Sequence, residues 1–174
     1  MKRTIIYVFG PKRLSSHYIS NIELNREDGG WLKIGQTSED DDNKDKLDSA
    51  MERINQESRT GIPEVCQLFD VFEYPELSGK VDDRIRNILT NELYSLECSK
   101  VHNQGLNKYE IKAGCEFVYG VTRNQVLNAI AKFERDLILD YYGKDGFEDF
   151  MEFNSSLKFE IKAKQFYAAS QRVL

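Results

Sequence analysis

The sequence has few of the features that mark membrane, secreted or zinc-binding proteins. No apolar run in its 174 residues approaches the length that spans a bilayer, so no membrane contact is expected. The three cysteines, Cys66, Cys98 and Cys115, are odd in number and widely spaced, which supports neither a disulfide framework nor a structural zinc site. The apolar run after Lys2 and Arg3 is too short for a signal peptide, so we expect a cytoplasmic protein.

The chain also lacks an excess of positive charge. Its formal net charge is −5. Non-specific affinity for nucleic acid comes mostly from Lys and Arg side chains that neutralise phosphates, so this total argues mildly against such a partner. However, many of the acids are concentrated in the run from Glu39 to Asp42, which we interpret as a solvated loop. The distribution of charge therefore matters more than the total.

The order of apolar and polar segments predicts one α/β (α+β) domain. Strand-like segments cover residues 4–9, 31–35 and 65–74, with a short one at 115–119. Helical patterns cover residues 43–58, 80–97 and 122–142. We expect a small central mixed three-stranded sheet flanked by helices in residues 1–142. Residues 143–174 form a C-terminal extension, either a peripheral hairpin or a part of the same domain.

The helical periodicity assigns side chains to faces. In the first long helix the predicted buried face consists of Leu47, Ala50, Met51 and Ile54, with Arg53 on its flank. In the second, Asp82 falls on the inward flank of the apolar stripe and Asp83 points away. Glu92 also projects toward that stripe, but it lies about 15 Å along the axis from Asp82, at 1.5 Å per residue. Asp82 and Glu92 therefore cannot serve one metal ion, and we expect Glu92 to be structural.

A cation lies inside the second strand. Residues 29–38 read Gly-Gly-Trp-Leu-Lys-Ile-Gly-Gln-Thr-Ser. Because side chains alternate along a strand, Lys33 shares a face with Trp31 and Gly35. Taken alone, such a lysine is best explained as protection of an edge strand against aggregation.

Four other short motifs accompany this lysine in a fixed order. The set is Tyr7 in the first strand, Lys33-Ile-Gly-Gln-Thr37, Arg53 on the next helix, Val81-Asp-Asp-Arg-Ile-Arg86, and Gly114-Cys-Glu116-Phe117. Together they resemble the GIY-YIG nuclease superfamily, in particular the branch whose second motif begins with Lys. The resemblance covers about residues 4–118. Five motifs in the right order on elements of the right type are a stronger signal than any one of them.

The resemblance implies a metal-dependent endonuclease that hydrolyses phosphodiester bonds in DNA, of the restriction or phage-related kind. Its catalytic residues would be Tyr7, Lys33, Arg53 and Glu116. Tyr7 would act as the general base or orient the water, with its pKa lowered by nearby cations such as Lys33. Lys33 and Arg53 would also bind the phosphates of the nucleic acid.

The resemblance further implies a single Mg²⁺ or Mn²⁺ ion, held by Asp82 or by Glu116. Asp82 stands where the family pattern has Glu, whose side chain is one methylene longer. Glu116 matches the pattern and is either the ligand or a residue that orients Arg53. The implied partner is DNA, double-stranded in the first place, bound by a homodimer or a larger restriction-type assembly. The alternative is a non-catalytic nucleic-acid- or protein-binding module on the same fold, to which Asp82, the acidic loop and the net charge point.

Overall fold

The structure is a computed structural model that describes residues 2–25, 27–62, 64–94 and 116–153. Its strands are β1 (Arg3–Pro11), β2 (Leu32–Glu39), β3 (Cys66–Pro75) and β4 (Phe117–Val118). Its α-helices are α1 (Ser15–Ile19), α2 (Lys46–Gly61), α3 (Val81–Asn87) and α4 (Arg123–Phe153). A 3₁₀ turn, η1 (Lys12–Leu14), precedes α1, and a π-helix, η2 (Ile88–Leu93), follows α3.

The four strands form one sheet in the order β3-β1-β2-β4, and each pairing is antiparallel. The α+β class is thus confirmed, whereas the expected mixed three-stranded sheet is wrong in both strand number and direction. Strands β2 and β3 do run parallel to each other, but β1 lies between them. The connection through α2 crosses β1, so no parallel pair forms.

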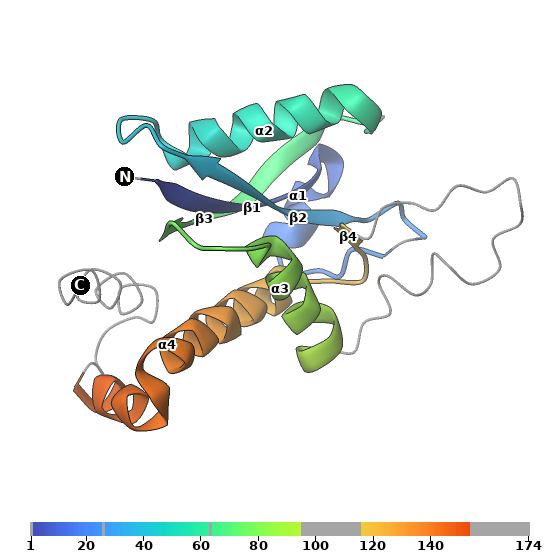
Figure 1. The fold of residues 1–174 in the computed structure, drawn as a ribbon. Helices are drawn as coiled ribbons and strands as arrows, with labels where there is room; N and C mark the ends of the chain where they lie inside the picture. The colour runs from blue at the N-terminus through green and yellow to red at the C-terminus, as the bar shows by residue number, and fades with distance from the viewer. Residues whose placement is uncertain (1, 26, 63, 95–115, 154–174) are drawn as a thin grey trace, which may run out of the picture.

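Helices cover both faces of the sheet, with α2 on one side and α3 and α4 on the other (Figure 1). Because side chains alternate along β1, Ile5, Tyr7 and Phe9 pack with α2, and Ile6 and Val8 pack in the larger core on the opposite face. A central strand covered on both faces has no solvated side, which explains why this segment reads as a continuous apolar run.

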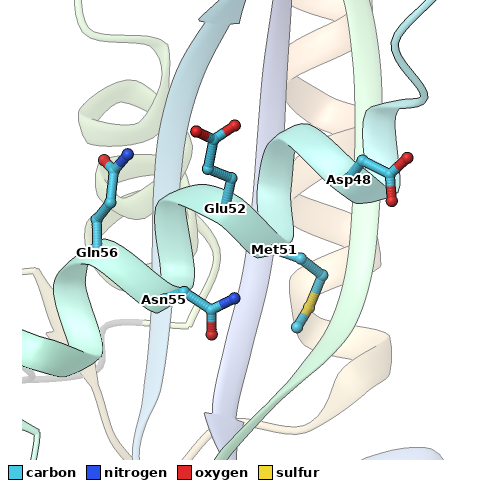
Figure 2. A pocket seen from close by; sticks show the side chains of 5 residues that line it. All are labelled: Asp48, Met51, Glu52, Asn55 and Gln56. Carbon is cyan, nitrogen blue, oxygen red and sulfur yellow. The ribbon is translucent and has the colours of Figure 1, made fainter.

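Helix α2 presents a different face to the sheet from the one predicted. Ala50 and Ile54 are buried as expected, but Leu47 is 49% exposed and Met51 38% exposed. Figure 2 shows Met51 bordering a depression formed only by side chains of α2 itself, with the strands behind the helix. The helix is rotated about its axis relative to the predicted orientation, because Ser49 and Glu57 face the sheet and make polar contacts there. The apolar periodicity carries no signal for such contacts, and the roll of α2 therefore differs from the prediction.

The helix predicted for residues 80–97 changes type in the middle. It is α-helical to Asn87 and continues as η2. A π-turn holds one residue more than an α-turn, so the buried face advances along the sequence. As a result Leu93 is 38% exposed, Tyr94 packs on the core, and Glu92 lies at the surface and not over the apolar stripe.

Helix α4 begins as its sequence predicts. Gln125 Oε1 accepts a hydrogen bond from the Thr122 N–H at 2.8 Å, and Thr122 Oγ1 accepts one from the Gln125 N–H at 3.3 Å, which is a capping box. The helix is interrupted at Gly143, where φ is 71°, and is helical again to Phe153. Residues 154–174 of the expected C-terminal extension lie outside the described residues. Among the described helices, none combines the length and apolar character needed to cross a bilayer.

In the acidic run, Asp40, Asp41 and Asp42 are exposed, as expected of a solvated loop, whereas Glu39 ends β2 and is largely enclosed. The Glu39 side chain is only 12% exposed and ion-pairs with Lys44 Nζ at 3.0 Å. It also accepts hydrogen bonds from Ser49 Oγ at 2.7 Å and from the Asp41 backbone N–H at 3.0 Å. The Asp41 N–H, followed by Ser49 and Lys44, lowers the pKa of Glu39 to about 2. Glu39 therefore ties the end of β2 to the start of α2.

The observed roll of α2 predicts which of its apolar residues stabilises the fold. Ile54→Ala should lower the free energy of unfolding by about 2–5 kcal/mol, because it leaves a cavity against the sheet. Met51→Ala, in the same helix, should change it by less than about 1 kcal/mol, because its side chain is partly solvated. Chemical denaturation of the two variants measures the difference, and equal losses would mean that Met51 faces the core.

Candidate active site

Tyr7 and Lys33 lie on neighbouring strands and on the same face of the sheet. In the antiparallel register of β1 and β2, Tyr7 is opposite Gly35 and Phe9 is opposite Lys33. Cross-strand partners project from one face, so both polar side chains point toward α2.

Gly35 leaves room for the tyrosine ring. A Cβ atom at position 35 would lie 2.5 Å from Cζ and 2.6 Å from the hydroxyl oxygen of Tyr7. Such distances are far inside van der Waals contact, so the ring covers the glycine and any side chain there would displace it. The Lys-Ile-Gly sequence therefore places the Lys33 side chain and the Tyr7 ring on the same face of the sheet.

Three side chains from three elements converge on the carboxylate of Glu57, in α2. The Tyr7 hydroxyl donates to Oε1 at 3.0 Å, Lys33 Nζ donates to Oε2 at 2.8 Å, and Arg53 Nε lies 3.2 Å from Oε1. Lys33 and Glu57 are nearly enclosed, with 12% and 15% of their side chains exposed, whereas Arg53 is 48% exposed. The head group of Arg53 thus lies against the same carboxylate as the polar groups of Tyr7 and Lys33.

The pKa of Tyr7 moves in the direction opposite to the one expected. Burial raises it most, and the adjacent Glu57 carboxylate raises it further, against a smaller lowering by Arg53. The expectation of a pKa lowered by Lys33 is therefore wrong, because Glu57 stands between the two groups and bonds to both. Tyr7 is a protonated phenol that donates its hydrogen to Glu57.

Glu116 is the second carboxylate on Lys33. Its Oε2 lies 2.7 Å from Lys33 Nζ, and this bond lowers the pKa of Glu116. Glu116 directly precedes β4, whose Phe117 is paired with Lys33 of β2. The Glu116 side chain is 54% exposed. Lys33 is therefore held by one enclosed and one exposed carboxylate.

Asp82 and Glu116 line one depression, whose lining does not include Tyr7, Lys33 or Arg53. Its volume is about 320 Å³, and its walls are the end of β2, the start of α3 and Glu116. The cation at its base is Arg86, whose residue is only 7% exposed. Arg86 donates to Asp82 Oδ2 at 3.1 Å, to Asp83 Oδ1, and to the carbonyl oxygen of Ile34 on β2. Asp83, expected to point away, thus shares Arg86 with Asp82, although its own side chain is 51% exposed.

Glu92 belongs to another neighbourhood, as predicted. Its carboxylate lies 3.2 Å from Lys132 Nζ on α4. The two site residues that the sequence reasoning missed are Glu57 and Arg86. Each follows a predicted site residue by four positions, Arg53 and Asp82 respectively, which is the spacing that brings side chains together on a helix.

The described side chains do not fit the divalent cation that the resemblance implies. Within residues 2–25, 27–62, 64–94 and 116–153, no three His, Cys, Asp or Glu side chains form a group that could hold a metal. Asp82 bonds to the guanidinium of Arg86, and Glu116 bonds to the ammonium of Lys33. A hard dication needs carboxylate oxygens that face it, and here these oxygens face resident cations.

Comparison with known proteins adds no relative. Neither the family models, nor the curated proteins, nor the solved structures contain a match to this chain. Any function must therefore be argued from the geometry of the site.

The contact between Tyr7 and Gly35 can be tested by adding one methyl group. Gly35→Ala should lower the free energy of unfolding by about 1–3 kcal/mol, because the ring has to leave its position. In a Tyr7→Ala background the same substitution should cost much less, since no ring is present to be displaced. Denaturation of the four proteins in this double-mutant cycle measures the coupling. Additive losses would show that the ring does not rest on the glycine.

Proposed function

We propose that the cluster around Glu57 hydrolyses phosphodiester bonds, and that the protein is a DNA endonuclease. The observation that carries the proposal is the convergence of Tyr7, Lys33 and Arg53 on one carboxylate. Phosphodiester hydrolysis needs a group that takes a proton from water, cations that offset charge on the phosphate, and a proton for the leaving oxygen. The cluster has a residue for each task.

The substrate phosphate would bind at Lys33 and Arg53. With Glu57 and Glu116 both in place, two cationic side chains face two carboxylates, and the cluster has no charge left for an anion. A phosphate group that displaces the exposed Glu116 from Lys33 leaves one net positive charge, which matches a phosphodiester monoanion. Arg53, exposed at the rim, adds its planar set of donors.

The protons would follow the hydrogen bonds of Glu57. Water gives a proton to the Tyr7 oxygen while the phenolic proton passes to Glu57 Oε1, and the resulting hydroxide attacks phosphorus. The bond from phosphorus to the leaving oxygen breaks, and that oxygen takes a proton from the Lys33 ammonium. Protonated Glu57 then returns a proton to Lys33, 2.8 Å away, so the site is restored. The raised pKa of Tyr7 suits this scheme, because the phenol keeps its proton until a proton from water reaches the Tyr7 oxygen and the phenolic proton passes to Glu57.

The proposal predicts a loss of activity that stability does not explain. Tyr7→Phe, Lys33→Met and Arg53→Leu should each reduce cleavage of plasmid DNA by roughly 10²- to 10⁴-fold. Gel assays on plasmid and on RNA measure the rate and the preferred nucleic acid.

Each of these variants has a matched control elsewhere in the chain. Tyr18→Phe also removes a buried tyrosine hydroxyl that donates to a carboxylate, at 2.8 Å from Asp70. Lys132→Met removes a lysine that bridges two carboxylates, and Arg84→Leu removes a half-exposed helical arginine. The controls should keep full activity. A wild-type protein that retains DNA without cutting it would favour the binding-module alternative.

The displacement of Glu116 predicts a gain of affinity. Glu116→Gln removes one of the two negative charges on Lys33, so binding of a non-cleavable phosphorothioate oligonucleotide should strengthen by roughly two- to fivefold, the scale of an exposed ion pair. Glu92→Gln is the control, because it removes one of two carboxylates from Lys132, remote from the site. Fluorescence anisotropy measures both. Weaker binding by Glu116→Gln would mean that Glu116 helps to hold the substrate.

A further inference from the structure

Arg86 is the most enclosed cation in the part of the chain that the structure describes near the site. Its residue is 7% exposed, and an enclosed charge costs several kcal/mol unless anionic and polar groups surround it. Here the guanidinium bonds to Asp82, to Asp83 and to the Ile34 carbonyl. The charge of Arg86 is therefore compensated by two carboxylates in the first turn of α3, and its bond to the Ile34 carbonyl holds the guanidinium against β2.

These contacts put Arg86 where the sequence led us to expect a metal ion. Asp82 and Glu116 were the two candidate ligands, and both line the depression that contains the guanidinium. The positive charge of Arg86 also contributes to the lowered pKa of Glu116. Ile34, which Arg86 holds, is the residue between Lys33 and Gly35. A cation at this point can thus neutralise the carboxylates and hold the strand that carries the proposed site.

We infer that the Arg86 guanidinium is the resident cation of this depression, and that the proposed cleavage needs no divalent metal. A dication beside Asp82 would lie against the guanidinium and be repelled by it. The wider cluster is already neutral: its cations are Lys33, Arg53, Lys80 and Arg86, and its anions are Glu57, Asp82, Asp83 and Glu116. No unbalanced negative charge is left among these residues to attract a metal ion.

Arg86 acts in this scheme as a positioning residue. Its fork of donors joins α3 to the edge of β2 beyond the two residues that pair with β4. A metal ion bound by one carboxylate would link only that carboxylate to the substrate. Arg86 in addition holds the backbone of Ile34, next to Gly35, on which the Tyr7 ring rests. For its catalytic consequence the inference rests on the proposed function, but the occupancy of the depression can be measured without any reaction.

The first measurement is Mn²⁺ binding by electron paramagnetic resonance on the full chain. The wild-type protein should show no saturable Mn²⁺ site. Arg86→Met frees Asp82 and Asp83, and should bind Mn²⁺ at least about tenfold more tightly than the wild type. Arg84→Met removes an arginine of the same helix that pairs with Asp140 on α4; it is the control and should gain nothing. Saturable binding by the wild type that Asp82→Asn or Glu116→Gln abolishes would overturn the inference.

The second measurement is plasmid cleavage in excess EDTA compared with excess Mg²⁺. Equal rates support a resident cation, and cleavage that EDTA abolishes and Mg²⁺ restores overturns it while upholding the nuclease. Absence of cleavage in both conditions would instead count against the proposed function, and Mn²⁺ binding would still decide the role of Arg86. If Arg86→Met fails to fold, the wild type and Asp82→Asn are sufficient for the binding test, because both retain the Arg86 bond to Ile34.

Discussion

The carboxylate of Glu57 is the point on which the candidate site depends. It lies one helical turn after Arg53 and accepts bonds from a tyrosine of β1 and a lysine of β2. Each of these groups would be costly to enclose alone, because a buried polar group without a partner loses its hydration. Around one shared acceptor they satisfy each other. The bonds between helix and sheet that hold α2 at this roll are therefore the bonds that form the site.

A comparable arrangement secures the opposite face of the sheet. The hydroxyl of Tyr18 on α1 donates to Asp70 on β3, and Arg123 at the start of α4 forms two bonds to the same carboxylate. The ring of Tyr18 stacks on Phe69, with 4.7 Å between the ring centroids. This cluster joins three elements through one aspartate, and among the described side chains Arg123 is the one cation bonded to Asp70. Its geometry suits it to hold α1 and α4 in place.

Local patterns were enough to place Tyr7 and Lys33 on strands and Arg53 on the flank of a helix, because these patterns depend on local geometry, whereas the resemblance alone grouped the three in one site. The all-antiparallel sheet was not foreseen, since strand direction depends on a crossover with no local signature. Glu57 and Arg86 were missed because their bonds to Tyr7, Lys33 and Ile34 cross to other elements, and the four-residue spacing from Arg53 and Asp82 does not by itself mark a site residue. Polar contacts also set which face of α2 packs on the sheet, and the π-helix η2 changes which side chains after α3 are buried. Apolar periodicity reveals neither effect.

The short length of β4 has a consequence for association between molecules. Among the described residues, β4 pairs with β2 only at Leu32 and Lys33, so within this part of the chain the edge of the sheet would be open from Ile34 onward. Open edges are templates for strand addition, the first step of many aggregates. Arg86 occupies the carbonyl of Ile34, and the side chain of Gln36 reaches across to the backbone N–H of Val81. The buried guanidinium of Arg86 thus also caps this edge of β2, so that the strand of a second molecule cannot pair with it at Ile34.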